Sequence, residues 1–237
     1  MSITKVALVT GATAGIGRAV AFALGHAGYA IGVASRSPDA VAETVAALQS
    51  AGIRAAGRPT DVADPTQVAA LVAHVEAELG SVDTLINNAG VGILKPFSEL
   101  SLEEWDTMFA TNVRSMYVVT AAVLPGMRAR KHGAIVNVAS LAGRNAFVGG
   151  TGYAATKHAV LGFSKCLLLE VRGDGVRVIA ICPGSVDTAL RREGAGSLGG
   201  NAAKFLQPED VADTILATLT LPERALVSEL DIRPAAP

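Results

Sequence analysis

The sequence has no surplus of charge of either sign, since its 237 residues include 20 basic and 21 acidic side chains. This balance argues against a nucleic-acid-binding protein, which normally carries a basic surplus or patch. No apolar run approaches the ~20 residues that a membrane-spanning helix needs. The N-terminus enters a strand-like segment almost at once and leaves no room for a signal peptide. We therefore expect a cytoplasmic protein with no nucleic-acid partner and no membrane anchor.

Cysteines are few as well. Cys166 and Cys182 are flanked by apolar residues, and both are expected to be small buried core residues of a reducing compartment rather than a disulfide pair. The four histidines show no spacing typical of metal ligands, so no metal site is predicted. Half of the residues are hydrophobic and only 17% are charged, which provides ample material for a buried core.

Short apolar segments alternate with helix-like segments along the whole chain. This alternation is typical of a parallel sheet covered by helices on both faces. We predict an α/β fold with one doubly wound, Rossmann-type domain over residues 1–237. The expected strands, about seven, cover 5–9, 29–35, 53–59, 82–87, 133–139, 176–181 and 225–232. The expected helices cover 17–28, 37–51, 64–80, 101–131, a segment around 153 and one from 208, and the tail 233–237 is expected to be loose.

Polar and glycine-rich clusters lie at the carboxyl ends of these strands, at 10–17, 35–36, 60–62, 87–90, 140 and 183–184. In doubly wound sheets, ligands bind outside the carboxyl ends of the strands. Turns alone would scatter glycines over both ends, so the clustering predicts a binding site at this edge.

The stretch TGATAGIG, residues 10–17, follows the first strand and opens a helix. Gly11 allows a tight turn, Gly15 lets the backbone approach a phosphate, and Gly17 lets helix and strand pack closely. The helix start offers N–H groups and partial positive charge to a pyrophosphate. Glycines also occur at strand-to-helix turns that bind nothing, so the dinucleotide interpretation depends on its place after the first strand of a βαβ unit.

Arg36 follows the second strand, where the adenosine ribose of a dinucleotide would lie. An acidic residue there binds a free 2′-hydroxyl, whereas an arginine accommodates a 2′-phosphate. We therefore predict NADP(H) as the preferred cofactor and NAD(H) as a possible one. A solvated loop arginine is the alternative. Asp61 is expected to accept a hydrogen bond from the adenine amino group, or else to be a simple turn aspartate.

Tyr153 and Lys157 are four residues apart in a helix-like segment, so their side chains should share one face. A free phenol titrates near ~10, and a neighbouring cation lowers that pKa towards the range useful for a general acid or base. A solvated helix face is the alternative for such a pair considered alone.

These motifs, together with NNAG at 87–90, Asn112, Ser140 and the PG-x-V-x-T string at 183–188, resemble the short-chain dehydrogenase/reductase family over essentially the whole chain. The 13 residues from Ser140 to Tyr153 also agree with it. The resemblance implies an oxidoreductase that transfers a hydride between NADP(H) and a ketone or secondary alcohol. A non-catalytic dinucleotide sensor on the same fold is the alternative from another class. Such a protein has no reason to retain the tyrosine, lysine and serine at this spacing.

The resemblance also implies four catalytic roles. Tyr153 is the general acid or base, and Lys157 lowers its pKa and hydrogen-bonds the nicotinamide ribose. Ser140 hydrogen-bonds the substrate oxygen, and Asn112 holds a water that connects the lysine to solvent. The residues expected to bind the cofactor are Gly11, Thr13, Gly15, Ile16, Gly17, Ser35, Arg36, Asp61, Val62, Asn88, Ala89, Gly90, Tyr153, Lys157, Pro183, Gly184, Val186 and Thr188.

The sequence departs from the family at two places. Ala14 stands where many NADP(H)-using members carry a basic residue, so the cofactor preference depends on Arg36 alone. The C-terminus reads ALVSELDIRPAAP in place of the V-D-G-G-like string of typical 3-oxoacyl-(acyl-carrier-protein) reductases. This weakens that specific assignment, and a 3-oxoacyl-thioester reductase remains the alternative function.

The substrate pocket is expected to be lined by 93–94, 141–148 and 185–205, which are mostly apolar. Arg144 either recognises an acidic substrate or is a solvated loop residue. The segment 185–206 is expected to be a substrate lid, with plain surface loop as the alternative. The basic string at 128–131 suits the end of a helix, or else it docks an acidic carrier protein. The resemblance further implies a homo-oligomer, either a tetramer or a dimer.

Overall fold

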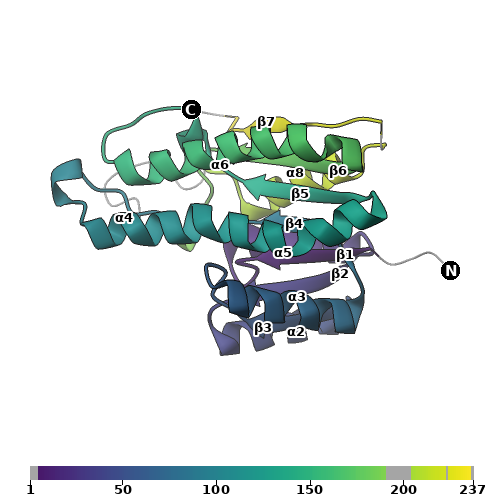
Figure 1. Ribbon diagram of the computed structural model, residues 1–237. Helices are drawn as coiled ribbons and strands as arrows, with labels where there is room; N and C mark the ends of the chain where they lie inside the picture. The colour runs from purple at the N-terminus through teal and green to yellow at the C-terminus, as the bar shows by residue number, and fades with distance from the viewer. Residues whose placement is uncertain (1–4, 191–203, 223, 236–237) are drawn as a thin grey trace.

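The computed structural model describes residues 5–190, 204–222 and 224–235, and these form one seven-stranded parallel sheet between two layers of helices (Figure 1). The predicted α/β, doubly wound architecture is confirmed. The strands are β1 (Val6–Thr10), β2 (Ala30–Ser35), β3 (Ala55–Pro59), β4 (Val82–Asn87), β5 (Gly133–Val138), β6 (Val176–Pro183) and β7 (Glu229–Ile232).

The strand order is β3-β2-β1-β4-β5-β6-β7, and every pair is parallel. The chain builds the sheet outward from β1 in one direction and then returns to build it from β4 in the other. The loops that follow β1 and β4 therefore diverge, and this point of reversal is where sheets of this kind bind ligands.

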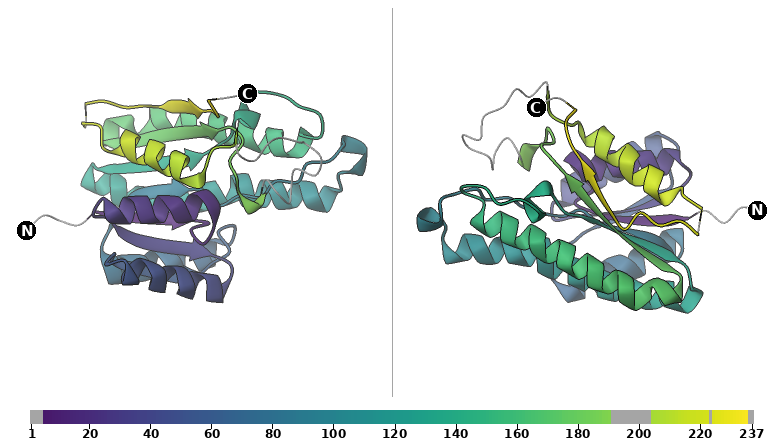
Figure 2. Two further views of the ribbon diagram at one scale, coloured as in Figure 1. Left: turned by 180° about the vertical axis from the view of Figure 1, so that it is seen from behind. Right: turned by 90° about the horizontal axis from the view of Figure 1, so that it is seen from above.

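Each face of the sheet has its own apolar core. The helices that cover these faces are α1 (Gly15–His26), α2 (Pro38–Ser50), α3 (Pro65–Leu79), α4 (Leu102–Phe109), α5 (Ser115–Arg130), α6 (Thr151–Val171) and α8 (Pro208–Leu219). Alternate residues of a strand point to opposite faces, so that Ala7 and Val9 pack with α1 and α8, while Val6 and Leu8 pack with α3 and α5. Figure 2 shows α1, α2 and α8 on one side of the sheet and α3, α5 and α6 on the other.

Short helical turns lie between these elements: the 3₁₀ turns η1 (Phe97–Glu99), η3 (Leu141–Gly143) and η4 (Arg172–Asp174), and the π-helical turn η2 (Ala110–Arg114). The long helical region predicted over 101–131 is confirmed: α4, η2 and α5 follow one another without a break from Leu102 to Arg130, and the π turn η2 is the irregularity that the sequence did not indicate. A capping box begins α4: the Ser101 hydroxyl oxygen accepts from the Glu104 N–H, and the Glu104 carboxylate accepts from the Ser101 N–H.

Two further predictions need correction. The last strand covers only Glu229–Ile232 rather than 225–232. Cys166 is exposed, while Cys182 is buried as expected. Ser164 and Leu167 belong to the buried side of α6, and Cys166 lies between them on the outward side because neighbouring helical residues point in different directions.

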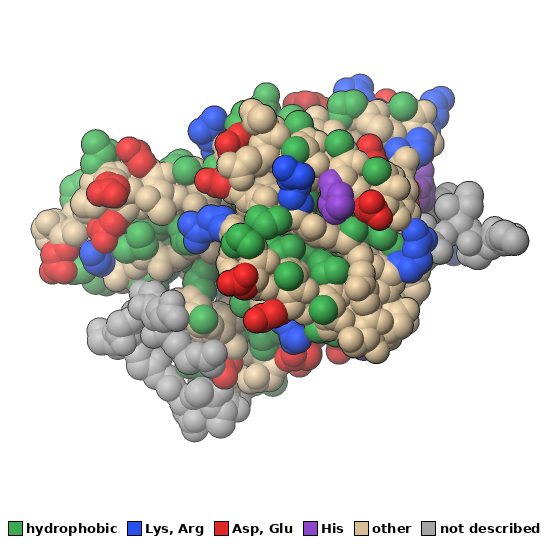
Figure 3. All heavy atoms as spheres, turned by 90° about the horizontal axis from the view of Figure 1, so that it is seen from below, with side chains coloured by type: hydrophobic (Ala, Val, Ile, Leu, Met, Phe, Trp, Pro, Cys, Tyr) green, Lys and Arg blue, Asp and Glu red, His purple; other side chains and the backbone are tan. Residues whose placement is uncertain are grey.

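The described part of the chain contains no helix long and apolar enough to cross a membrane. On the face in Figure 3, acidic and basic side chains are interspersed among hydrophobic ones, and neither sign gathers into a single patch. This surface agrees with the balanced composition.

Candidate active site

A pocket of about 1440 Å³ lies along the edge at which the strands end, and segments that follow all seven strands line it. Among the predicted site residues, Gly17 and Asn112 are the two that do not line it. Those that do are Gly11, Thr13, Gly15, Ile16, Ser35, Arg36, Asp61, Val62, Asn88, Ala89, Gly90, Ser140, Tyr153, Lys157, Pro183, Gly184, Val186 and Thr188.

The glycine turn between β1 and α1 has the geometry of a phosphate cradle. The backbone is left-handed at Gly11 (φ 63°) and Gly15 (φ 50°), a conformation that favours glycine. A Cβ on Gly17 would lie 2.2 Å from the Gly11 carbonyl oxygen, so only glycine fits. Among the described residues, no side chain caps the first N–H groups of α1 at Ala14. The turn therefore fits the pyrophosphate of a dinucleotide.

The loop after β4 is fixed against this turn by Thr10. The Thr10 hydroxyl oxygen accepts hydrogen bonds from the backbone N–H groups of Asn88 and Ala89, each at 3.0 Å. The Asn88 side-chain amide donates to the Thr10 carbonyl oxygen at 3.0 Å. These hydrogen bonds thus hold the loops after β1 and β4 together.

Polar side chains from three loops gather where the adenosine half of a dinucleotide would lie. Thr13 donates to the Ser35 hydroxyl at 3.1 Å, and the exposed Arg36 follows directly. The Asp61 carboxylate accepts a hydrogen bond from the Ala63 N–H at 2.9 Å, as a turn aspartate does, and it also lines the pocket.

Ser140, Tyr153 and Lys157 meet in the middle of the pocket. Ser140 follows β5. Its hydroxyl oxygen accepts from the Ala142 N–H at 3.1 Å, and its hydroxyl donates to the Pro183 carbonyl oxygen at 3.5 Å. The Lys157 ammonium donates to the Val138 carbonyl oxygen at 2.9 Å and lies 5.7 Å from the centre of the Tyr153 ring. The predicted sharing of one helix face by the tyrosine and the lysine is confirmed.

Burial sets the pKa of both α6 groups. It raises the pKa of Tyr153, and the hydrogen bond with Ser140 lowers this pKa by less. Burial lowers the pKa of Lys157 to about 8, against a smaller raising effect from the Cys182 thiol. The expected lowering of the Tyr153 pKa by the neighbouring ammonium is therefore not found: desolvation of the phenol is the largest cause of the shift, and Lys157 is not among its causes.

Asn112 lies behind the wall of the pocket, in the π turn η2. Its side-chain amide donates to the Val91 carbonyl oxygen at 2.9 Å and to the Thr156 hydroxyl at 3.0 Å. Its carbonyl oxygen accepts from the Val91 N–H at 2.8 Å. The buried Asn112 thereby ties the loop after β4 to α6, one residue from Lys157. Single π turns of this kind are frequent at functional sites.

The predicted substrate loops line the pocket only in part. Leu94, Leu141, Ala142 and Phe147 contribute, whereas Ile93 is not among the lining residues and Val148 is 91% exposed. Of the predicted lid, 185–190 and 204–206 are described, and the lining residues there are Ser185, Val186, Thr188, Ala189, Leu190, Lys204 and Phe205. Residues 191–203 lie outside the described residues.

Arg144 does not line the pocket, and it lies in an exposed turn, as the loop alternative predicted. Its guanidinium pairs with Glu229 at 2.5 Å and with Asp231 at 2.6 Å, both on β7. Residues 233–235 of the tail, which was expected to be loose, belong to no helix or strand but have a place in the site. Arg233, Pro234 and Ala235 line the pocket, and no motif in the sequence had indicated this.

The basic string at the end of α5 lies at the opposite edge of the sheet. Arg128 pairs with Asp174 at 2.7 Å, and Arg130 donates to the carbonyl oxygen of Val82, the first residue of β4, at 2.7 Å. These contacts support the interpretation as a helix end. A carrier protein docked there would face away from the pocket.

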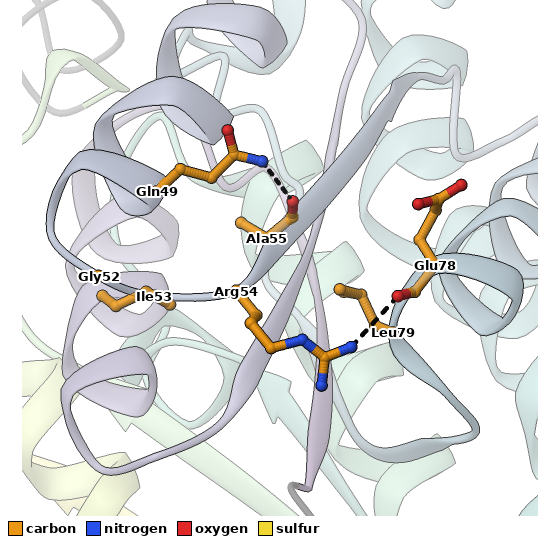
Figure 4. Close-up of a pocket in the computed structure, with 7 residues that line it drawn as sticks. All are labelled: Gln49, Gly52, Ile53, Arg54, Ala55, Glu78 and Leu79. Atoms are coloured by element: carbon orange, nitrogen blue, oxygen red, sulfur yellow. Dashed lines mark hydrogen bonds between the residues drawn. The ribbon is translucent and has the colours of Figure 1, made fainter.

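A second, smaller pocket also lies at that opposite edge, between the ends of α2 and α3 (Figure 4). Two of its polar side chains hydrogen-bond the backbone: Gln49 donates to the Ala55 carbonyl oxygen at 3.0 Å, and Arg54 to the Glu78 carbonyl oxygen at 3.2 Å. We assign it no ligand.

Comparisons with known proteins agree with a dinucleotide-binding pocket. A family model described as short chain dehydrogenase matches residues 5–196. The monensin polyketide synthase putative ketoacyl reductase of Streptomyces virginiae is 42% identical over 191 residues, which cover 80% of this chain and 73% of that protein.

Two solved structures superpose closely. A variant of the actinorhodin polyketide ketoreductase with NADPH has a TM-score of 0.90 at 34% identity, over 98% of this chain and 96% of its own. An alcohol dehydrogenase from the archaeon Thermococcus sibiricus, complexed with 5-hydroxy-NADP, has a TM-score of 0.89 at 31% identity, over 99% and 98%.

Proposed function

The chain belongs to the short-chain dehydrogenase/reductase family, and on that premise we propose that it uses NADP(H) to interconvert a ketone and a secondary alcohol. The observation that carries the proposal is the meeting of Ser140, Tyr153 and Lys157 in one pocket with an uncapped glycine turn. The ketoacyl reductase relatives favour a 3-oxoacyl compound within the broader ketone class.

The bound cofactor supplies the hydride, and the protein manages the charge and the proton. As negative charge develops on the carbonyl oxygen, the hydroxyls of Ser140 and Tyr153 stabilise it by donating hydrogen bonds. Tyr153 then gives its proton to that oxygen and acts as general acid. In alcohol oxidation the same group accepts the proton. The raised pKa keeps Tyr153 protonated at neutral pH, which suits reduction.

Lys157 and Asn112 have supporting roles in this proposal. The Lys157 ammonium holds the nicotinamide ribose and stabilises the phenolate that forms when Tyr153 gives up its proton. Asn112 fixes the loop and the helix on either side of the lysine through its bonds to Val91 and Thr156. The Asn112 carbonyl oxygen has a second lone pair, to which a water on the path from the lysine to solvent would donate.

The lid and the oligomer belong to the same proposal. Residues 185–206 act as a lid over the substrate, and their described ends already line the pocket. Copies of the chain associate through the outer faces of α5 and α6. Tyr117 and Leu169 on these helices are 63% and 65% exposed, and burial of such side chains favours association.

Replacement of Arg36 by aspartate should reverse the cofactor preference. We expect the ratio of kcat/KM for NADPH to kcat/KM for NADH to fall about 10- to 100-fold, because a charged hydrogen bond to the 2′-phosphate contributes about 1.5–3 kcal/mol. Steady-state kinetics with both cofactors measures this ratio. Arg172→Asp is the matched control, since Arg172 is an exposed residue of η4 before the start of β6. An equal change in both variants would contradict the assignment of Arg36.

The proposed activity is tested with purified protein, NADPH and a panel of ketones, diketones and 3-oxoacyl thioesters. We expect NADPH consumption with at least one member of the panel, and 3-oxoacyl compounds should give the highest kcat/KM. If the protein binds NADPH but reduces no member of the panel, the catalytic proposal fails and a non-catalytic dinucleotide sensor is favoured instead.

A further inference from the structure

Five charged side chains around β7 form a cluster, which we call the β7 charge cluster: Arg144, Lys165, Glu229, Asp231 and Arg233. It contains three cations and two carboxylates, so its net charge is +1. Arg144 holds both carboxylates at 2.5 and 2.6 Å and is their closest partner. The excess positive charge therefore belongs to the two outer cations, Lys165 and Arg233.

The two outer cations differ in what they face. Lys165 lies 3.5 Å from Glu229 and does not line the pocket, whereas Arg233 does. Within the described residues, the one polar partner of Arg233 is Asp231, at 3.3 Å. That carboxylate is shared with Arg144. A guanidinium has five N–H donors, so most of those of Arg233 stay available to a ligand.

Arg233 lies at the substrate end of the pocket, and the backbone contacts show why. The Gly184 N–H donates to the carbonyl oxygen of Ile232, the last residue of β7, at 2.8 Å. A Cβ on Gly184 would contact both Leu141 and Pro234, at 3.2 and 3.3 Å. The tail thus packs beside the residue that follows Ser140.

The charges that line the pocket are unevenly distributed. Among the described lining residues, Asp61 is the one carboxylate, and it follows β3 at the far edge of the sheet. The substrate end carries Lys157 and Arg233 in its lining. An anionic group placed there would meet net positive charge, and Coulomb attraction across a partly enclosed pocket is stronger than in bulk water.

We propose that Arg233 is a specificity-determining residue that binds an anionic group of the substrate, a carboxylate or a phosphate, remote from the carbonyl that is reduced. The inference rests on the proposed function, since it specifies the substrate class of the same site. Two sources share this chemistry: the carboxylate of a small oxo acid and the phosphate of a phosphopantetheine thioester.

Binding is measured calorimetrically in the presence of NADP⁺, under which no oxo compound is reduced. One ligand pair is 3-oxohexanoate and its methyl ester; the other is a 3-oxohexanoyl pantetheine thioester with and without its phosphate. We expect the wild-type protein to bind one anion about 10-fold more tightly than its neutral partner, a modest effect because the Arg233 side chain is 57% exposed. The pair that shows the preference identifies the source.

Arg233→Gln should bring that ratio to about one while leaving the affinity for the neutral ligand within about twofold. Arg233→Lys should keep part of the preference, because it keeps the charge. Lys165→Gln is the matched control, since it removes the same charge from the β7 charge cluster outside the pocket and should leave the ratio unchanged.

Equal affinities within both pairs for the wild-type protein would overturn the inference, as would a preference that survives in Arg233→Gln. Because binding is measured without turnover, the result is independent of the ketone panel. A preference for the anion in a protein that reduces no ketone would leave the anion site standing and reject only the proposed reaction.

Discussion

Replacement of Tyr153 by phenylalanine is expected to lower the turnover number about 10³- to 10⁵-fold and to leave NADPH binding within about twofold. Loss of the general acid costs about 10²- to 10⁴-fold, and loss of one donor to the developing oxyanion adds to it. Single-turnover kinetics measures the loss of turnover, and a separate NADPH titration measures cofactor binding. Tyr117→Phe is the matched control, because Tyr117 lies outside the pocket and phenylalanine keeps the ring that the proposed interface on α5 would bury.

The wild-type pH profile tests the same role. Burial raises the pKa of Tyr153, so the phenol that donates the proton should persist well into the alkaline range and sustain reduction there. Oxidation of the alcohol needs the phenolate and should rise with pH over the same range. A Tyr153→Phe enzyme with full turnover, or one whose profile keeps the wild-type shape, would contradict the assignment.

The second large effect is expected for Lys157→Met, which should change activity and stability in different ways. Turnover should fall about 10²- to 10⁴-fold, because the cation next to the proton donor is lost. The free energy of unfolding of the cofactor-free protein should not show a comparably large decrease. A buried ammonium is itself costly, as the lowered pKa of about 8 indicates.

The contribution of Lys157 to the free energy of unfolding depends on pH, and its direction follows from the pKa shift. The pKa of Lys157 is about 8 in the folded protein and 10.5 as its ordinary value. Between these pH values the unfolded chain binds more protons, so the contribution of Lys157 to stability is least favourable below pH ~8 and improves as the pH rises. Relative to wild type, the free energy of unfolding of the Met variant should fall by roughly 3 kcal/mol between pH 7 and pH 10.5.

Urea unfolding of both proteins across that pH range measures the difference. Lys165→Met is the control, because Lys165 is 65% exposed on the same helix and should show no comparable trend. If the difference in free energy of unfolding between wild type and Lys157→Met stays constant with pH, the burial of a titrating lysine is contradicted.

Much of the site was predictable from local sequence. The glycines of the turn after β1 are needed for left-handed backbone and close packing, and their identity alone indicates both. The clustering of NNAG, Ser140 and Pro183–Gly184 in one pocket follows from strand alternation, since parallel strands end at one edge.

The remaining features depend on contacts distant in sequence. The pairing of Arg144 with β7 joins segments more than 80 residues apart, and no local pattern marks it. The placement of Arg233 in the pocket depends on the bond between Gly184 and Ile232. The direction of the Tyr153 pKa shift could not be predicted without knowing how deeply the phenol is buried, because helix spacing reveals the neighbouring cation but not the desolvation.

The π turn η2 also limits how this chain can change in length. A π turn holds one residue more than the regular helix around it, and removal of one residue from 110–114 would restore an uninterrupted α-helix. The helices on either side would keep their register, because the π turn absorbs its extra residue locally, but the bulge that carries Asn112 would be lost. Asn112 would lose its alignment with Val91 and Thr156. This segment therefore accepts exchanges of side chains far more readily than a single-residue deletion, and variant libraries of this protein should keep its length fixed.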